Sequence, residues 1–252
     1  MKTALLVLSL SLNVLAIQGG MALPKDWSGR SAVVRIGSGE RGSTVSKCSG
    51  VLLTPKVVLT AAHCFLEFNS IRKVSIENLE TGAVHNTLFK TIAKPGYIAS
   101  FHDNPDFVRN GYDLGLIILK WDVPFKLPVF ELSKEEKDFN LLAPNIWLIA
   151  NGSQKPFYDS TSSSIPIAEI SKRLFEGSDA FYQYKSAQLK AGPCEGDSGG
   201  GVFSWKDGLW TLEGIQSTKR AAPDCGDEHN RGFFVPIYLN RDWIQSVVKG
   251  VE

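Results

Sequence analysis

The sequence predicts an all-β fold, a barrel or a sandwich, that ends in one C-terminal helix. Short runs rich in Val, Ile, Leu and Trp recur along the chain, and Gly, Pro, Asn and Asp separate them, which is typical of antiparallel β proteins. Helical periodicity is clear once, near the end of the chain. Strands without long intervening helices argue against alternating βαβ units.

The β-like runs and the helix can be placed in order along the chain. The runs cover residues 32–36, 50–53, 57–60, 114–119, 146–150, 209–216 and 232–237. Apolar residues then recur at helical spacing with polar residues between them, at Leu239, Trp243, Ile244, Val247 and Val248. This last pattern predicts an amphipathic helix.

The first 22 residues have the features of a secretory signal peptide. Lys2 precedes an apolar run over residues 4–17, and small residues follow at Gly20 and Ala22. The run is shorter than the roughly 20 residues that a membrane-spanning helix needs, which argues against a retained anchor. We expect cleavage after Ala22, one domain over residues 23–252, no membrane anchor, and a secreted protein, extracellular or, in a Gram-negative bacterium, periplasmic.

The charge of the chain does not indicate a nucleic-acid partner. Without Lys2, the sequence has 26 basic and 26 acidic residues, and it contains no basic run. A protein that binds nucleic acid through phosphates needs a surplus of Lys and Arg on one face. We therefore expect a neutral surface and no nucleic-acid partner.

Four cysteines, Cys48, Cys64, Cys194 and Cys225, follow the predicted signal peptide. Four cysteines allow three pairings, and export permits disulfides. The close pairs, 48 with 64 and 194 with 225, would each close a modest loop and add about 3 kcal/mol of stability. The sequence contains neither a Cys-x-x-Cys motif nor a histidine pair near the cysteines, the patterns that would indicate a zinc site. We expect neither a metal nor an organic cofactor.

The strongest chemical signal is the motif GDSGG over residues 196–200. A serine hydroxyl becomes a nucleophile when a base removes its proton and N–H donors stabilise the oxyanion that forms. Glycines allow the backbone to turn tightly, so that amide groups converge beside the hydroxyl. We predict Ser198 as the nucleophile and the N–H groups of Gly196 and Ser198 as the oxyanion hole. Taken alone, the motif is also compatible with an ordinary glycine-rich hairpin.

Two other segments supply a candidate base and its partner. His63 lies in TAAHC, residues 60–64, directly after a β-like run, and Asp113 stands at the start of the apolar strand 114–119. A buried aspartate needs a partner, and a histidine Nδ1–H would provide one while it fixes the tautomer of the ring. We predict His63 as the general base and Asp113 as the group that orients it. Taken singly, a structural histidine and a turn aspartate explain each residue equally well.

The order of these residues narrows the class of enzyme. His63, Asp113 and Ser198 follow one another as in the chymotrypsin-type arrangement, whereas an α/β-hydrolase has Ser, then the acid, then His. After Ser198 only His229 remains, with only nearby loop aspartates between them. The missing βα pattern also excludes that second class.

The chain resembles the chymotrypsin/trypsin family of serine peptidases over residues 31–248. The resemblance rests on CSGVLL (48–53), LTAAHC (59–64), DLGL (113–116), CEGDSGG (194–200) and the closing helix around Trp243. It implies two six-stranded antiparallel β-barrels with the triad between them and peptide hydrolysis through an acyl-enzyme. It also implies the pairings Cys48–Cys64 and Cys194–Cys225, and it assigns to Ser217 the support of Asp113.

The sequence departs from the family at its activation segment. Many members are cut before an Ile-Val-Gly-Gly-like start, and the new amine pairs with the aspartate before the nucleophile, here Asp197. The segment Arg35-Ile36 imitates that start but lies close to Cys48, and we interpret residues 33–36 as the first barrel strand. The sequence identifies no partner for Asp197.

The sequence also departs from trypsin-like members at the predicted substrate pocket, formed by Gly192, Ser217, Lys219 and Gly232. Those members carry an aspartate at the position of Gly192, where it binds Lys or Arg, so we do not expect cleavage after basic residues. Lys219 would fill the pocket entrance or pair with an acidic substrate, and the alternative is a solvated cation. We expect a preference for small, apolar or acidic side chains.

Together these features predict a secreted serine endopeptidase, a monomer that acts on protein or peptide substrates. The main alternative is a catalytically inactive protease homologue that acts as a binding protein, which the missing activation start favours. A secreted esterase with the same acyl chemistry is a more distant third. Retention of all three triad residues favours the peptidase.

Overall fold

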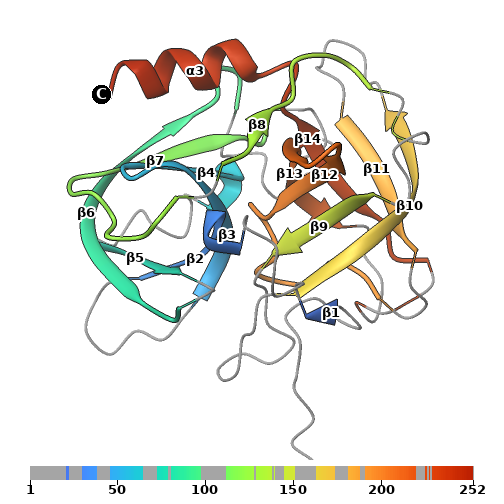
Figure 1. The fold of residues 1–252 in the computed structure, drawn as a ribbon, viewed down its shortest axis with the longest axis horizontal. Helices are drawn as coiled ribbons and strands as arrows, with labels where there is room; N and C mark the ends of the chain where they lie inside the picture. Colours follow the sequence, from blue (N-terminus) through green and yellow to red (C-terminus); the bar gives the residue numbers. More distant parts are fainter. Residues whose placement is uncertain are drawn as a thin grey trace, which may run out of the picture.

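Two closed antiparallel barrels lie side by side, and one helix follows them, as the computed structural model shows (Figure 1). The structure describes residues 21–22, 30–38, 46–64, 73–78, 81–97, 112–127, 129–137, 139, 145–150, 163–173, 181–187, 191–219, 225, 227 and 229–251. Among these, no helix has the length and apolar character needed to cross a bilayer.

The first barrel contains six strands, each hydrogen-bonded to its neighbours in a closed ring. In ring order they are β2 (Val33–Ser38), β3 (Ser46–Thr54), β4 (Val57–Thr60), β7 (Gly115–Leu119), β6 (Val84–Ala93) and β5 (Lys73–Asn78), which returns to β2. Residues 35 and 36 lie inside β2, where Ile36 pairs with Cys48 and Ile76. The predicted first barrel strand is therefore confirmed.

The second barrel is also a ring of six strands. They are β9 (Ile146–Ala150), β10 (Ser163–Arg173), β11 (Phe181–Ser186), β14 (Gly232–Pro236), β13 (Leu209–Lys219) and β12 (Gly201–Lys206), which returns to β9. Two short strands are added to this ring, β1 (Met21–Ala22) on β10 and β8 (Glu131–Leu132) on β13. Cleavage at the predicted position after Ala22 would remove β1. The predicted fold class, two six-stranded barrels and a C-terminal helix, is confirmed.

Several strands of the first barrel are buried on both faces. Val34, Val58 and Ile117 point into the barrel, where they join one apolar cluster. Their neighbours along the strands, such as Val33 and Leu116, belong to a second cluster that also includes residues of the other barrel. Since successive side chains of a strand point to opposite faces, this double burial explains why these strands are continuous apolar runs in the sequence.

The C-terminal helix α3 (Arg241–Lys249) covers the first barrel although it follows the second in the chain (Figure 1). Ile244 is fully buried, and Trp243, Val247 and Val248 pack against the cluster between the barrels. The apolar face that the sequence predicts is thus the face that holds the helix to the rest of the fold.

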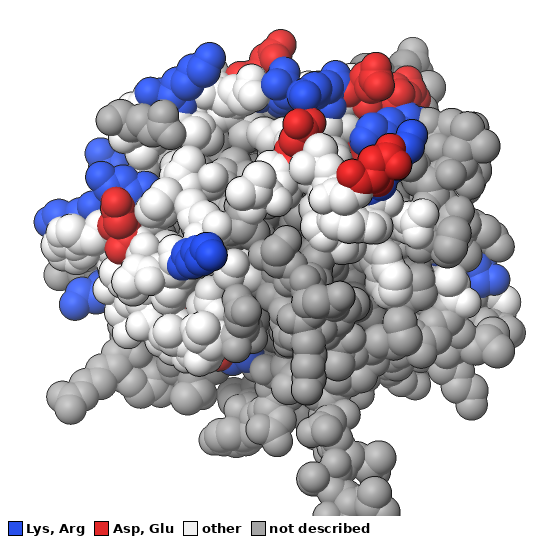
Figure 2. Space-filling view, viewed as in Figure 1, with Lys and Arg blue, Asp and Glu red and all other residues white. Residues whose placement is uncertain are grey.

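Charged side chains of both signs share the described surface. Figure 2 shows basic and acidic side chains interspersed along the upper edge of the face that it draws. Mixed charge of this kind agrees with the balance of Lys and Arg against Asp and Glu in the sequence.

Candidate active site

The residues predicted to form a triad lie where the two barrels meet. His63 follows β4, Asp113 precedes β7, and these two strands pair with Thr60 opposite Gly115. This pairing explains why two residues 50 positions apart in sequence are neighbours in space. Ser198 belongs to the turn that precedes β12 of the second barrel.

Asp113 holds His63 at two points. The backbone N–H of His63 donates to Asp113 Oδ1 at 2.8 Å, and His63 Nδ1 lies 2.8 Å from Asp113 Oδ2. Ser217 Oγ donates to the same Oδ2 at 2.5 Å. Because an ionised carboxylate only accepts hydrogen bonds, the proton of the neutral imidazole is on Nδ1, and Nε2 is left as an acceptor.

The carboxylate of Asp113 is ionised although it is completely buried. Burial by itself raises the pKa of this group, but the attraction to His63 when the ring is protonated and the hydrogen bonds from His63 and Ser217 outweigh it, so the pKa lies below its ordinary value. The buried aspartate expected at the start of β7 therefore has its partner.

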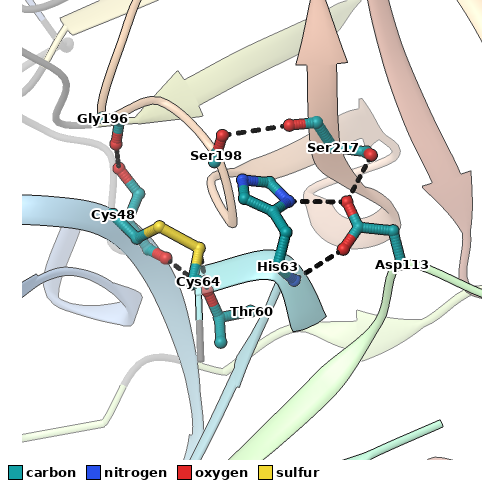
Figure 3. Close-up of a disulfide and its surroundings, with 9 residues drawn as sticks. Cys48, Thr60, His63, Cys64, Asp113, Gly196, Ser198 and Ser217 are labelled. Carbon is teal, nitrogen blue, oxygen red and sulfur yellow. Dashed lines mark hydrogen bonds and ion pairs between the residues drawn. A yellow bond between two sulfur atoms is a disulfide. The ribbon is translucent and has the colours of Figure 1, made fainter. Parts of the chain in front are cut away.

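Ser198 and His63 lie next to each other, with the imidazole between Asp113 and Ser198 (Figure 3). The Ser198 hydroxyl donates to the backbone oxygen of Ser217 at 3.0 Å. Ser217 thus contacts two of the three predicted triad residues. The side chain of Ser217 donates to Asp113, and the backbone carbonyl of Ser217 accepts from Ser198. Ser217 lies where the pairing of β13 with β14 shifts register, between Gln216 and Lys219.

The turn that carries Ser198 is anchored to the first barrel through its carbonyl groups. Ser49 N–H donates to Ser198 O at 2.7 Å, and Ser49 Oγ donates to Gly196 O at 2.9 Å. Gly196 and Gly199 have φ angles of 85° and 84°, which side-chain-bearing residues rarely adopt. Among the described residues, no backbone hydrogen bond uses the N–H of Gly196 or Ser198.

Asp197 turns away from solvent beneath this turn. Its side chain is completely buried, and the N–H of Cys194 donates to Asp197 Oδ2 at 2.7 Å. The N–H of Asp197 donates in return to the carbonyl of Cys194 at 3.2 Å. These two bonds fold the chain before Ser198 into a compact loop.

The two disulfides have the pairing that the family resemblance implies, Cys48–Cys64 and Cys194–Cys225. The first links β3 to the residue after His63, and the second holds the loop before Ser198. Among the described residues, one group of metal-ligating types lies close together, Cys48, His63 and Cys64. Its two sulfur atoms are joined to each other, so neither is available as a thiolate ligand.

The residues predicted to line the substrate pocket lie on neighbouring segments. Gly232 of β14 pairs with Lys219 of β13 and with Tyr184 of β11. Asn230, just before β14, donates from Nδ2 to the carbonyls of Pro193 and Cys225, at 3.1 and 2.6 Å.

Three buried residues of this region were missing from the sequence prediction, Tyr184, Gln216 and Asn230. The register of β11, β14 and β13 places Tyr184 and Gln216 beside the site, and bonds to the carbonyls of Pro193 and Cys225 place Asn230 there. A buried polar side chain within an apolar strand is the one signal that could have indicated Gln216.

Comparison with known proteins identifies the class that this fold and site define, the trypsin-like serine proteases. The family model described as Trypsin matches residues 19–244, and the chain therefore belongs to the trypsin family.

Relatives of several kinds share a modest identity with the chain. Coagulation factor XI of Bos taurus is 24% identical over 81% of this chain, which spans 33% of that protein. Serine protease 41 of Homo sapiens is 27% identical over 80% of this chain and 69% of its own length. Kallikrein 1-related peptidase b1 of Mus musculus is also 27% identical, over 80% of both chains.

The fold agrees with a solved structure. Neuropsin, a serine protease expressed in the limbic system of mouse brain, superposes with a TM-score of 0.63 at 21% identity, over 93% of this chain and 100% of its own. The resemblance expected from the sequence is thus confirmed at the level of the family and the fold.

Proposed function

We propose that this chain is a secreted serine endopeptidase that acts through His63, Asp113 and Ser198. The observation that carries the proposal is the double contact of Asp113 with the backbone and the ring of His63, which orients Nε2 toward Ser198 (Figure 3). A ring held in this way can accept a proton on one side while the carboxylate stabilises the resulting imidazolium on the other.

The reaction has two halves. Ser198 Oγ attacks the peptide carbonyl carbon while His63 Nε2 takes the hydroxyl proton, and the N–H groups of Gly196 and Ser198 receive the oxyanion. His63 then returns the proton to the leaving amine, and the C–N bond breaks to give an acyl-enzyme. Water, activated by the same nitrogen, releases the acid product and restores Ser198.

The first half requires one rotation. The Ser198 hydroxyl donates to the carbonyl of Ser217 in this structure. A turn about the Cα–Cβ bond brings the proton to His63 Nε2, and catalytic hydrogen bonds often tighten only when substrate binds.

Secretion and the kind of substrate belong to the same proposal. The apolar run at residues 4–17 and the two disulfides support export to an oxidising compartment. Gly192 has no carboxylate to bind Lys or Arg, which supports cleavage after other residues.

A fluorophosphonate probe tests the proposal directly. We expect the probe to label the exported protein at Ser198, and we expect Ser198→Ala or His63→Ala to abolish labelling while the circular dichroism spectrum is retained. Mass spectrometry of the same sample gives the N-terminus of the exported chain. Folded wild-type protein that takes no label would instead support the inactive homologue that binds other proteins.

A further inference from the structure

Side chains of the protein occupy the space beside both glycines of the predicted pocket. A Cβ atom on Gly232 would overlap the ring of Tyr184. A Cβ atom on Gly192 would lie 2.5 Å from Asn230 Nδ2 and 2.5 Å from the carbonyl oxygen of Cys225. The room that glycine leaves at these two positions is therefore already filled from within the barrel.

Tyr184 is held firmly in this place. Its side chain is 1% exposed, and its hydroxyl donates to Gln216 Oε1 at 2.6 Å. Gln216 Nε2 donates in turn to the carbonyl of Thr218 at 2.8 Å. Burial and the nearby charge of Asp197 raise the pKa of Tyr184 well above its ordinary value, so the hydroxyl stays protonated as a donor.

The chain of contacts from Tyr184 ends beside the nucleophile. The backbone of Gln216 accepts from Gly199 N–H at 2.7 Å and donates to Gly200 O at 2.8 Å, directly after Ser198 in the sequence. The next residue, Ser217, accepts from the Ser198 hydroxyl. Tyr184 is therefore linked through Gln216 to the segment of β13 that contacts Ser198.

A substrate attacked by Ser198 brings the side chain of its attacked residue close to this part of β13, because Ser198 Oγ lies 3.0 Å from the backbone oxygen of Ser217. That side chain starts two bonds from the carbon that Ser198 Oγ attacks. Gly232 pairs across the strands with Lys219, two residues after Ser217, and the Tyr184 ring lies against it. A large side chain would have to displace a buried, hydrogen-bonded aromatic ring, which close-packed interiors resist.

We propose that Tyr184 closes the recess beside Ser198 and restricts cleavage to bonds that follow Gly, Ala or Ser. This inference rests on the proposed peptidase function. It narrows the expected residue before the cleaved bond from any residue that is not basic to one with a small side chain. Tyr184 acts here as a specificity-determining residue, and Gln216 positions it.

The test measures kcat/KM for matched peptides that carry Ala, Phe or Lys before the cleaved bond. We expect wild type to favour Ala over Phe and over Lys by about tenfold or more, the size of effect that a pocket gives for a misfitting side chain. Tyr184→Ala removes the ring, and we expect it to shift the Ala-to-Phe ratio toward Phe by about tenfold or more.

Two variants separate the ring from general damage to the core. Tyr184→Phe keeps the ring and should retain the wild-type ratio. Tyr182→Ala deletes another buried tyrosine of the same strand, one whose hydroxyl donates to Glu136 instead, and it should also retain the ratio.

The possible results are distinct. Wild-type cleavage after Phe or Lys as fast as after Ala overturns the inference, as does a folded Tyr184→Ala enzyme with an unchanged ratio. If Tyr184→Ala does not fold, the wild-type peptide series decides alone. A small fluorophosphonate reacts with Ser198 without entering the recess. Absence of labelling therefore contradicts the peptidase function itself. Labelling together with a preference for large residues contradicts only the role of Tyr184.

Discussion

Asp113 combines full burial with an ionised side chain, and each of its oxygen atoms accepts a hydrogen bond. Such a group is costly to bury unless partners surround it, and His63 and Ser217 are those partners here. The same three residues set the tautomer and the orientation of the imidazole. At the scale of single residues, stability and the proposed chemistry therefore depend on the same contacts.

Replacing Asp113 by Asn should keep the fold but remove most of the activity. An amide can donate to His63 Nδ1, which would move the ring proton to Nε2 and leave no base for Ser198. We expect kcat to fall by about 10⁴-fold, measured with a peptide substrate, and KM to change little. Asp122→Asn is the matched control because that carboxylate is 63% exposed and pairs with Lys56 at 3.7 Å. Loss of less than tenfold for Asp113→Asn would show that His63 is oriented by other groups.

Gly199→Ala should disrupt the turn that carries Ser198. At this glycine φ is +84°, and an added Cβ would overlap the carbonyl oxygen of Ser49 and the hydroxyl of Thr60. Gly208→Ala is the control, since φ is +82° there and nothing lies within 4 Å of the added atom. We expect the control to cost only the left-handed backbone penalty, about 1–2 kcal/mol, and Gly199→Ala to cost more, by urea unfolding. Equal losses would mean that the overlap relaxes freely.

At the scale of elements, the segment that leads from the first barrel to the second is tied to β13 by an ion pair whose carboxylate is buried. Lys137 Nζ lies 2.6 Å from Glu213 Oε1, and the carboxylate of Glu213, in β13, is fully buried. Ser204 of β12 donates to the same oxygen at 2.5 Å, and Ser133 N–H donates to Leu212 O at 3.0 Å. The connecting segment is thus tied to the strand whose far end carries Ser217.

Removing the cation of this pair should destabilise the fold strongly. Lys137→Met leaves the Glu213 carboxylate buried without a cation, which typically costs about 3–5 kcal/mol. Lys134→Met is the control, because its pair with Glu131 is exposed, with side chains 59% and 46% accessible, and such pairs contribute about 0–1 kcal/mol. Chemical denaturation of both variants measures the difference. Similar values for the two would show that the buried pair adds no more than the exposed one.

At the scale of the whole molecule, the proposed active site depends on how the barrels are joined. His63 and Asp113 come from one barrel and Ser198 from the other, and Ser49 binds the Ser198 turn across the boundary. The apolar cluster between the barrels and α3 holds both parts together. Loosening this interface should therefore separate Ser198 from His63.

The disulfide next to His63 offers a test at this scale. Cys48→Ala with Cys64→Ala opens a link between residues 16 positions apart and should lower the free energy of unfolding by about 3 kcal/mol. Because Cys64 adjoins His63, we also expect kcat to fall more than KM rises. Kinetics and urea unfolding of the purified double variant measure both effects. Full activity with lowered stability would show that the bridge supports the barrel but not the imidazole.

Much of the fold and of the candidate site could be predicted because it depends on local chemistry. The apolar runs predict strands such as β4 and β7, the helical spacing predicts α3, and the short motifs around residues 63, 113 and 198 predict a triad whose catalytic role is still to be tested. Strands β5 and β6 give weaker patterns, since several of their residues are exposed or only partly buried.

The sequence by itself determined the chain order of the proposed triad and, through short motifs, the family. The two disulfide pairs followed only from the resemblance to that family, and the structure confirmed them. Only the tertiary structure placed Tyr184 against Gly232 and Asn230 against Gly192. The physical reason is that cross-strand register in a closed barrel joins residues far apart in sequence, and no local pattern records which side chain will fill the space beside a glycine. For the proposed recess beside Ser198, the sequence showed the two glycines, and the fold determined which side chains lie against them.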